Sequence, residues 1–224
     1  MVFTSSLVAL GDTTEIGVAT EEDLSKHCGT FTSLYEKTKY DSHIITQKLI
    51  DEQNAPITIA MPGAVFGEND HSTLGDSIKQ IIRGTLLGIP TIDTKKNHIH
   101  VEDVAQGIIL CLEKGKTGPY LLTGPVENNI TSAEFFEKVA KIGGFTLPER
   151  KLTKGAIWMA VQLYSLKQFL TGKRQFVSRE LLKVMKANAQ TTNEKAVKEL
   201  GFSPKPLEER IKQTVEWYKK KYGK

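Results

Sequence analysis

Short apolar segments alternate with longer amphipathic ones in this 224-residue chain, and this alternation restricts the fold more than any other feature. The apolar segments, each expected to form a strand, cover residues 2–8, 56–61, 97–101 and 118–124. The amphipathic segments, each expected to form a helix, cover residues 32–53, 74–87 and 102–112. Strands that alternate with helices form parallel sheets with helices on both faces. The sequence therefore predicts an α/β fold over residues 1–124.

The C-terminal part of the chain has a different pattern, because helices dominate there. Thr131 and Glu134 have the spacing of a capping box, which predicts a helix that begins here and runs to Ile142. Further helices are predicted at residues 154–170, 178–188, 193–200 and 207–222. We therefore expect residues 125–224 to form a small, mainly helical lobe beside the sheet.

Composition and charge exclude several classes of function. The net charge of +4 comes partly from a lysine-rich helix end at residues 219–224, and no basic stripe interleaved with aromatic side chains predicts a nucleic-acid partner. The longest apolar segment, residues 156–170, is too short and too polar to span a membrane. The histidines and cysteines show no metal-ligand spacing, so we expect no metal site. Cys28 and Cys111 stand alone, which favours a reducing, cytoplasmic location.

A chemical motif stands out in the helix predicted at residues 32–53. Tyr35 and Lys39 are four residues apart, so their side chains lie on one face of the helix. When a carbonyl group is reduced its oxygen must gain a proton, and a tyrosine hydroxyl can donate it. A nearby ammonium group makes a tyrosinate easier to form, because it lowers a pKa that is otherwise about 10. Ser6, at the end of the upstream strand, supplies a second hydrogen-bond donor for the substrate oxygen.

Alone, a Tyr-x-x-x-Lys pair is a weak signal. The structural alternative is that Tyr35 is a half-buried helix residue and Lys39 a solvated one. The surroundings favour the catalytic interpretation. The helix follows an apolar strand that ends in Ser5-Ser6 and precedes a strand that ends in Pro62-Gly63.

Several segments occur in an order that resembles the extended short-chain dehydrogenase/reductase family, which includes NAD-dependent epimerases and dehydratases. These segments are Val2-Phe-Thr-Ser-Ser-Leu7, Tyr35-Glu-Lys-Thr-Lys39, Ile59-Ala-Met-Pro-Gly-Ala-Val-Phe-Gly67, His100-Val-Glu-Asp-Val-Ala105, Tyr120-Leu-Leu-Thr-Gly124 and Asn193-Glu-Lys-Ala-Val-Lys-Glu-Leu-Gly-Phe202. The resemblance covers almost the whole chain. It is closer to the dihydroflavonol-reductase-like branch, because the segment from Met61 to Gly67 lacks the asparagine that sugar-nucleotide enzymes of this family commonly carry there.

The resemblance implies a role for each residue of the motif. Tyr35 is then the catalytic acid/base, and Lys39 is its partner, which also holds the ribose of a nicotinamide cofactor, either NAD or NADP. Ser6 corresponds to the family's catalytic serine, and Ser5 is the less favoured choice and a cofactor contact. The segment expected to line the nicotinamide consists of Pro62, Gly63, Ala64 and Val65. Asp103 is expected to cap a helix.

The phosphate-binding part of the family pattern does not occur in this sequence. In the family, a Gly-x-x-Gly-x-x-Gly loop after the first strand lets the backbone approach the cofactor pyrophosphate, and this chain has no such loop. By the resemblance, the chain opens at about the fifth strand of a Rossmann-like sheet and is a fragment of a longer enzyme. Residues 1–124 are then the C-terminal half of a dinucleotide-binding domain with an incomplete sheet, and residues 125–224 are the substrate-binding lobe. The strand predicted at residues 2–8 would have an open edge.

The leading interpretation is an NAD(P)-dependent oxidoreductase of the extended short-chain type, which reduces or oxidises a carbonyl or alcohol on a small organic substrate. A nucleotide-sugar epimerase or dehydratase is the alternative within the family. A non-catalytic scaffold that docks through the open sheet edge is the alternative from another class. Family members often pair through the helix that bears Tyr35 and Lys39, which implies a homodimer.

Overall fold

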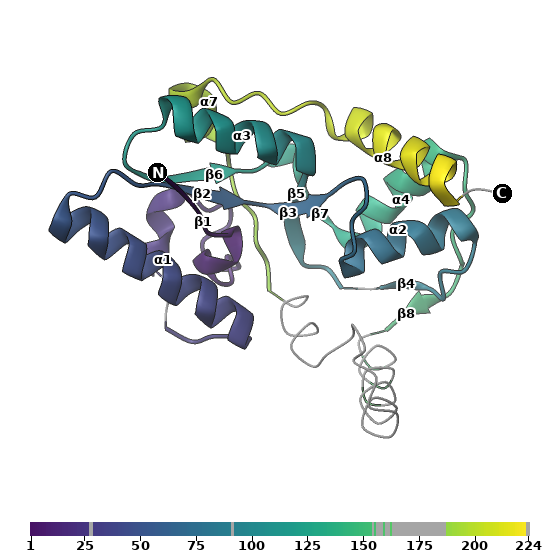
Figure 1. Cartoon of the computed structure of the whole chain (residues 1–224). Helices are drawn as coiled ribbons and strands as arrows, with labels where there is room; N and C mark the ends of the chain where they lie inside the picture. Colours follow the sequence, from purple (N-terminus) through teal and green to yellow (C-terminus); the bar gives the residue numbers. More distant parts are fainter. Residues whose placement is uncertain are drawn as a thin grey trace, which may run out of the picture.

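The structure is a computed structural model of the chain, and it describes residues 1–26, 29–90, 92–153 and 187–222, with the single residues 155, 159 and 162. Figure 1 shows a central sheet between layers of helices, with a further group of helices at one end. The predicted α/β class is confirmed. The helices predicted at residues 154–170 and 178–188 lie largely outside the described residues. Among the helices that are described, none is long and apolar enough to cross a membrane.

The central strands form a parallel sheet that begins with the first residues of the chain. β1 (Val2–Thr4) pairs with β2 (Thr58–Pro62), and β2 pairs with β6 (Gly118–Leu122), all in parallel. After β2, β3 (Ala64–Phe66) pairs in parallel with β5 (Lys95–His100), whose other edge carries the antiparallel β7 (Asn129–Thr131). β4 (Ile89–Pro90) and β8 (Lys151–Leu152) form a separate two-stranded ribbon.

Apolar side chains of β2 point alternately to the two faces of the β1-β2-β6 sheet, and each face carries a hydrophobic core. Ile59 and Met61 of β2 belong to a cluster on one face, against which side chains of α1 (Leu34–Gln53) pack. Ala60, between them, packs on the other face with α3 (Val101–Lys114) and α7 (Glu194–Leu200). Successive side chains of a strand point to opposite faces. Accordingly, α1 lies below the sheet in Figure 1, and α3 and α7 lie above it.

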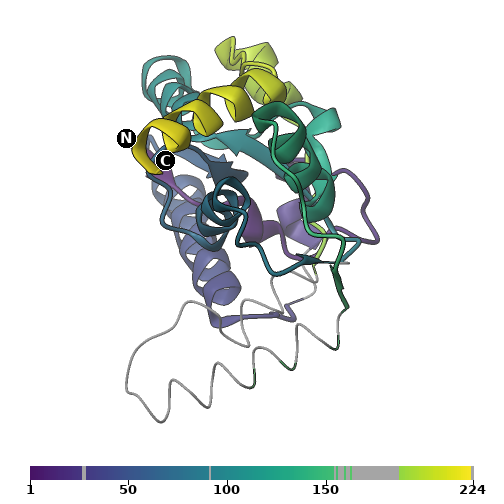
Figure 2. The same ribbon diagram turned by 90° about the vertical axis from the view of Figure 1, so that its right-hand side faces the viewer.

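A second core lies at the other end of the molecule, where three helices meet. α2 (Thr73–Arg83), α4 (Ser132–Gly143) and α8 (Leu207–Tyr222) bury a cluster that includes Phe66 and Phe135, whose ring centroids are 5.0 Å apart. Figure 2 shows this end of the molecule, with α8 in yellow. α2 precedes residue 124 and belongs to this core, whereas α7 follows residue 124 and packs on β6. Each core therefore draws on both sides of residue 124, and the division there stays a prediction.

A buried ion pair joins α8 to α3. Arg210 donates from Nε to Asp103 Oδ2 at 3.0 Å and from Nη2 to the other carboxylate oxygen. Its Nη1 donates to Glu102 Oε2 at 2.5 Å. Asp103 is only 2% exposed, and a buried carboxylate needs a charged or hydrogen-bonding partner.

The expectation that Asp103 caps a helix is therefore wrong. The N-cap of α3 is His100, whose Nδ1 accepts a hydrogen bond from the Glu102 N–H at 3.3 Å. Asp103 lies inside the first turn and turns towards Arg210. A local preference of aspartate for helix starts was outweighed by a partner 107 residues away.

Local signals explain where most other elements begin and end. Ser33 caps α1 by accepting from the Glu36 N–H at 3.0 Å, and the predicted Thr131–Glu134 capping box is formed at the start of α4.

The strand predicted at residues 2–8 is too long, because β1 ends at Thr4 and Ser6 then caps a 3-10 helix, η1 (Leu7–Leu10). α2 ends at Arg83, earlier than predicted, where Gly84 takes a left-handed conformation with φ 64°. Two more 3-10 helices, η2 (Glu21–Lys26) and η3 (Val126–Asn128), lie in segments for which the sequence predicts neither strand nor helix.

Residues 187–192 form a strap between β5 and the segment that follows β1. The Ala189 N–H donates to Lys95 O at 2.9 Å, and the Ala189 carbonyl accepts from the Asn97 N–H at 3.2 Å. On the other side, the Thr13 N–H donates to Asn188 O at 3.0 Å. The strap therefore connects β5 to the segment that follows β1 through backbone hydrogen bonds.

Candidate functional site

A cavity of about 720 Å³ lies where the carboxyl ends of β1 and β2 meet the start of α1. Ligands of open α/β sheets bind at this edge of the strands. The described residues that line the cavity are Leu7, Val8, Gly11, Thr32, Tyr35, Glu36, Gly63, Ala64, Val65, Ser72, Thr73, Leu74, Lys96, Ala187, Asn188 and Ala189. The structure thus brings together the predicted tyrosine and three residues of the segment predicted to line the nicotinamide.

Tyr35 lies in the first turn of α1, and 49% of its surface is exposed. The segment that precedes Tyr35 is fixed to the helix, because the Glu36 carboxylate accepts a hydrogen bond from the Thr32 N–H at 2.8 Å. Lys39 lies one turn further along the same helix, as its spacing predicts, but it is not among the residues that line the cavity. The position of the tyrosine beside the cavity is a finding, and the role of the lysine stays a prediction.

The two serines after β1 point their hydroxyl groups into the protein. The Ser5 hydroxyl lies 2.9 Å from His43 Nδ1 of α1, and both residues are buried. Burial lowers the pKa of His43 to about 4, so its imidazole is neutral at pH 7. The Ser6 hydroxyl accepts a hydrogen bond from the Val8 N–H at 3.3 Å. Neither serine is among the cavity-lining residues, so their roles remain predictions.

The segment after β2 comes very close to β5. A Cβ atom at position 63 would lie 2.7 Å from Asn97 O, so only glycine fits there. The Asn97 side chain is itself fixed, because its Oδ1 accepts from the Gly124 N–H at 2.7 Å and its Nδ2 donates to Gly124 O at 3.1 Å. Pro62 is buried at the end of β2, outside the cavity lining, and Ala64 and Val65 continue the cavity wall.

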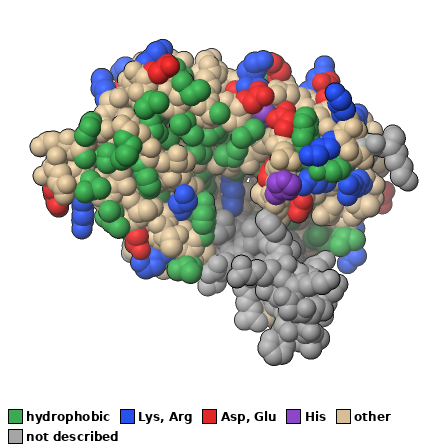
Figure 3. Space-filling model, viewed as in Figure 1, with side chains coloured by type: hydrophobic (Ala, Val, Ile, Leu, Met, Phe, Trp, Pro, Cys, Tyr) green, Lys and Arg blue, Asp and Glu red, His purple; other side chains and the backbone are tan. Residues whose placement is uncertain are grey.

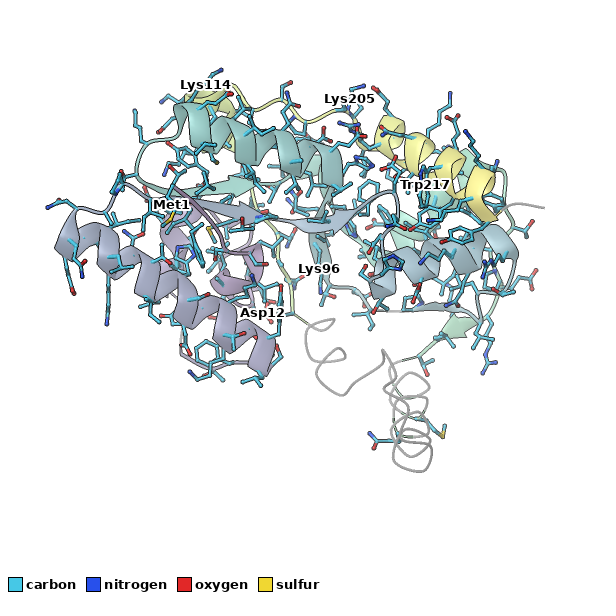
Figure 4. The ribbon with its side chains drawn as sticks, viewed as in Figure 1. Met1, Asp12, Lys96, Lys114, Lys205 and Trp217 are labelled. Carbon is cyan, nitrogen blue, oxygen red and sulfur yellow. The ribbon has the colours of Figure 1, made fainter. Side chains whose placement is uncertain are left out.

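The sequence motifs miss Lys96, which lines this cavity and also a second one of about 310 Å³. Figure 4 places Lys96 between the two ends of the molecule, and Figure 3 shows basic atoms at the floor of a hollow at this place in the same view. Burial lowers the pKa of the Lys96 ammonium group to about 8. Lys96 shares a strand face with His98, which is buried in the structure, so this face of β5 is not a solvated one.

His98 adds a neutral imidazole to the second cavity. Its ring stacks on Phe135 with the centroids 4.6 Å apart, and its Nδ1 lies 2.9 Å from Lys96 O. Burial lowers the pKa of His98 to about 4. Because a carbonyl oxygen only accepts hydrogen bonds, Nδ1 carries the proton. Across the described ranges, no group of three or more His, Cys, Asp or Glu side chains is placed to hold a metal ion.

A sequence profile of the NAD dependent epimerase/dehydratase family matches residues 1–122, more than half of the chain. The chain belongs to this family. The matched region contains β1, α1, β2 and the cavity residues Tyr35 and Gly63. The resemblance found in the sequence motifs is therefore confirmed.

The relatives of this epimerase/dehydratase family member are longer than the chain itself. The mouse protein short-chain dehydrogenase/reductase family 42E member 1 is 28% identical over 174 residues, which cover 70% of this chain and 42% of the mouse protein. The crystal structure of gox2253 matches with a TM-score of 0.73 at 27% identity, over 99% of this chain and 66% of that one. PA4631 from Pseudomonas aeruginosa, a nucleoside-diphosphate-sugar epimerase, matches with a TM-score of 0.75 at 22% identity, over 99% of this chain and 67% of that one.

Two further proteins of the same fold were solved with nicotinamide cofactors. They are dTDP-glucose 4,6-dehydratase from Bacillus anthracis with NAD (TM-score 0.71, 18% identity) and RMD from Pseudomonas aeruginosa with NADPH (TM-score 0.67, 14% identity). In this chain, Tyr35 and the wall from Gly63 to Val65 share one cavity with room for a nicotinamide ring, so these residues fit that half of the cofactor. For the pyrophosphate, the sequence supplies no Gly-x-x-Gly-x-x-Gly loop.

Proposed function

We propose that this chain carries the catalytic residues and the substrate-binding part of an NAD(P)-dependent oxidoreductase that interconverts a carbonyl group and an alcohol on a small organic substrate. The observation that supports the proposal best is that Tyr35 meets the Gly63–Val65 wall in one cavity. A tyrosine hydroxyl suits proton transfer at a carbonyl oxygen, and the family is NAD dependent. Under the proposal, residues 1–124 are the C-terminal half of the dinucleotide-binding domain and residues 125–224 are the substrate-binding lobe.

The residues of this chain would manage the proton of the reaction. A bound nicotinamide cofactor supplies the hydride in reduction and accepts it in oxidation. In reduction, the Tyr35 hydroxyl gives its proton to the carbonyl oxygen as the carbonyl carbon gains the hydride, and in oxidation the tyrosinate takes the proton back. Lys39, one turn along α1, brings a positive charge near the tyrosinate and holds the ribose hydroxyls. Ser6 donates a second hydrogen bond to the substrate oxygen as its negative charge grows.

The lining of the cavity favours an apolar substrate over a sugar nucleotide. Leu7, Val8 and Leu74 give it hydrocarbon walls, and among its described lining residues Lys96 is the only cation. A sugar nucleotide carries many hydroxyls and two phosphates, which all need partners when they leave water. A nucleotide-sugar epimerase or dehydratase, as PA4631 is described, is therefore the second candidate, supported by the shared fold.

The proposal includes NAD or NADP as the cofactor, a cytoplasmic location and a homodimer formed through α1. The face of α1 that points away from the sheet supports the dimer. Leu34 and Ile45 on this helix are 64% and 61% exposed, which is unusual for large apolar side chains in a monomer.

The first experiment is a titration of the purified 224-residue chain with NADH and with NADPH, followed by nucleotide fluorescence. Turnover is then measured with a panel of apolar ketones and with UDP-glucose, by the loss of reduced nicotinamide or by sugar analysis. We expect saturable but weak nucleotide binding, because the chain supplies residues for the nicotinamide half of the cofactor and no pyrophosphate loop. We also expect ketone reduction, and we expect Tyr35→Phe to lower turnover by about 100-fold or more at unchanged nucleotide affinity.

Tyr40→Phe is the matched control, because Tyr40 lies on the same helix and its ring packs against Phe31. It removes one hydroxyl from α1 without touching the cavity lining, so its turnover should equal that of the unsubstituted chain. A folded chain that binds neither nucleotide would refute the proposal, and so would a Tyr35→Phe variant with full activity. Conversion of UDP-glucose without ketone reduction would assign the second candidate instead.

A further inference from the structure

The two cavities share a wall and lie side by side. Ala64, Thr73, Leu74 and Lys96 line both of them. Tyr35 belongs to the first cavity alone, and Leu86, Pro90, Phe136 and Leu152 belong to the second alone. The four shared residues place the two cavities next to each other, with Lys96 at their boundary.

The second cavity is built for hydrocarbon. Leu86, Phe136 and Leu152 provide aliphatic and aromatic surface, and Pro90 completes it. Among its described lining residues, the polar side chains are two serines, Ser77 and Ser132, the Thr73 of the shared wall and the neutral imidazole of His98, besides Lys96 itself. Such a lining binds an alkyl or aryl group through burial of apolar area.

Lys96 supplies a positive charge at the boundary of these two largely apolar cavities. Among the described lining residues of both cavities it is the only lysine or arginine. The one carboxylate there, Glu36, is buried and accepts hydrogen bonds from Thr32. A partly desolvated ammonium group gains most from a single negative charge held beside it. A carboxylate carries such a charge at the end of a hydrocarbon chain, so it complements both the ammonium group and the apolar walls.

We propose that the second cavity is a substrate subsite, and that Lys96 selects an amphipathic monocarboxylate whose hydrocarbon part fills that cavity. The inference rests on the proposed function in one respect, because it places the reacting carbonyl or alcohol in the first cavity beside Tyr35. The acid group then lies at the junction of the two cavities, against the ammonium group. Lys96 is in this view a specificity-determining residue, and it takes no part in the hydride or proton transfer.

The test compares two fluorescent probes, 11-(dansylamino)undecanoic acid and its methyl ester, titrated into the full 224-residue chain without cofactor. The probes have the same hydrocarbon and differ in the charge of the acid group. We expect the acid to bind about tenfold tighter than the ester, or more, as a charge-assisted hydrogen bond provides. Lys96→Met should remove this preference by weakening the acid alone, and Lys96→Arg should keep it.

Two further variants complete the design. Lys95→Met is the matched control, because Lys95 is the neighbouring strand residue, is exposed and lines neither cavity. It should bind both probes as the unsubstituted chain does. Leu152→Ser shortens the apolar wall of the second cavity and should weaken acid and ester equally. Circular dichroism establishes that each variant is folded.

Equal binding of acid and ester by the unsubstituted chain would overturn the proposal, as would full acid affinity in Lys96→Met. Displacement of the probe by UDP at lower concentration than by decanoate would also overturn it, because the junction would then be a phosphate site. The binding assay needs neither cofactor nor turnover. An acid preference without any ketone reduction would therefore keep the subsite and refute the proposed reaction, and ketone reduction without an acid preference would do the reverse.

Discussion

Replacement of Arg210 by methionine is expected to lower the free energy of unfolding by about 3 to 5 kcal/mol. The methionine fills a similar volume but leaves the Asp103 carboxylate, which is 2% exposed, without its charged partner. The lost contact to Glu102 adds little, because the Glu102 side chain is 55% exposed and water replaces Arg210 there. The guanidinium of Arg210 has its pKa raised chiefly by its hydrogen bonds with Asp103, which shows where the coupling is concentrated.

Urea unfolding followed by circular dichroism measures the effect, with the slope of the transition as a check on two-state behaviour. The double variant Asp103→Leu with Arg210→Met removes both charges and should recover most of the loss, because the buried orphan charge is gone. Lys205→Met is the control, since the Lys205–Glu209 pair has both side chains more than half exposed and should contribute less than about 1 kcal/mol. A loss below about 1 kcal/mol for Arg210→Met, or additive losses in the double variant, would refute the reasoning.

Three further predictions concern the candidate site. The pKa of Lys96 is lowered to about 8 from 10.5, so the folded state holds this proton less tightly than the unfolded state, and stability should rise with pH between these values. Lys96→Met should remove that rise and stabilise the protein at pH 7 by at most about 3 kcal/mol in urea unfolding. The pKa of His43 is lowered to about 4 from 6.5, so stability should fall as pH drops through this window, and thermal unfolding of His43→Gln should show a smaller fall. Gly63→Ala should cost about 1 to 3 kcal/mol in thermal or urea unfolding, because its methyl group would press on Asn97 O, and an unchanged midpoint would contradict the close approach of these two segments.

Signals that act within one turn of chain were readable from the sequence. Ser33 and the Thr131–Glu134 box mark the starts of α1 and α4 because the side chain and the N–H that it caps are three residues apart. The four-residue spacing of Tyr35 and Lys39 is likewise a property of the helix itself. The family pattern then identified the segment from Gly63 to Val65, and the structure brings that segment to the same cavity as Tyr35.

Features that depend on distant partners were not readable in this way. Asp103 is of a residue type that often caps helices, and only the fold shows that Arg210 of α8 reaches it. The sequence gives Lys96 the pattern of a solvated strand residue. Only the fold shows that it lines two cavities together with residues of α2 and of the strap. The sequence predicts Ser6 at the end of a strand, but its hydroxyl accepts a hydrogen bond from the Val8 N–H and caps η1.

The strap at residues 187–192 limits the ways in which the substrate specificity of this cavity can be altered. Ala187 and Ala189 line the first cavity, and the backbone of Ala189 is bonded to β5 on both sides of Lys96. The hydrogen bonds of Ala189 to β5 hold this part of the cavity wall in place, and its methyl side chains are too short to move aside. A change of substrate would therefore be accommodated by exchanging side chains such as Leu74 and Leu152, while the width between strap and strand stays constant. Point substitutions at these side chains are then expected to change the specificity of this chain without moving its backbone.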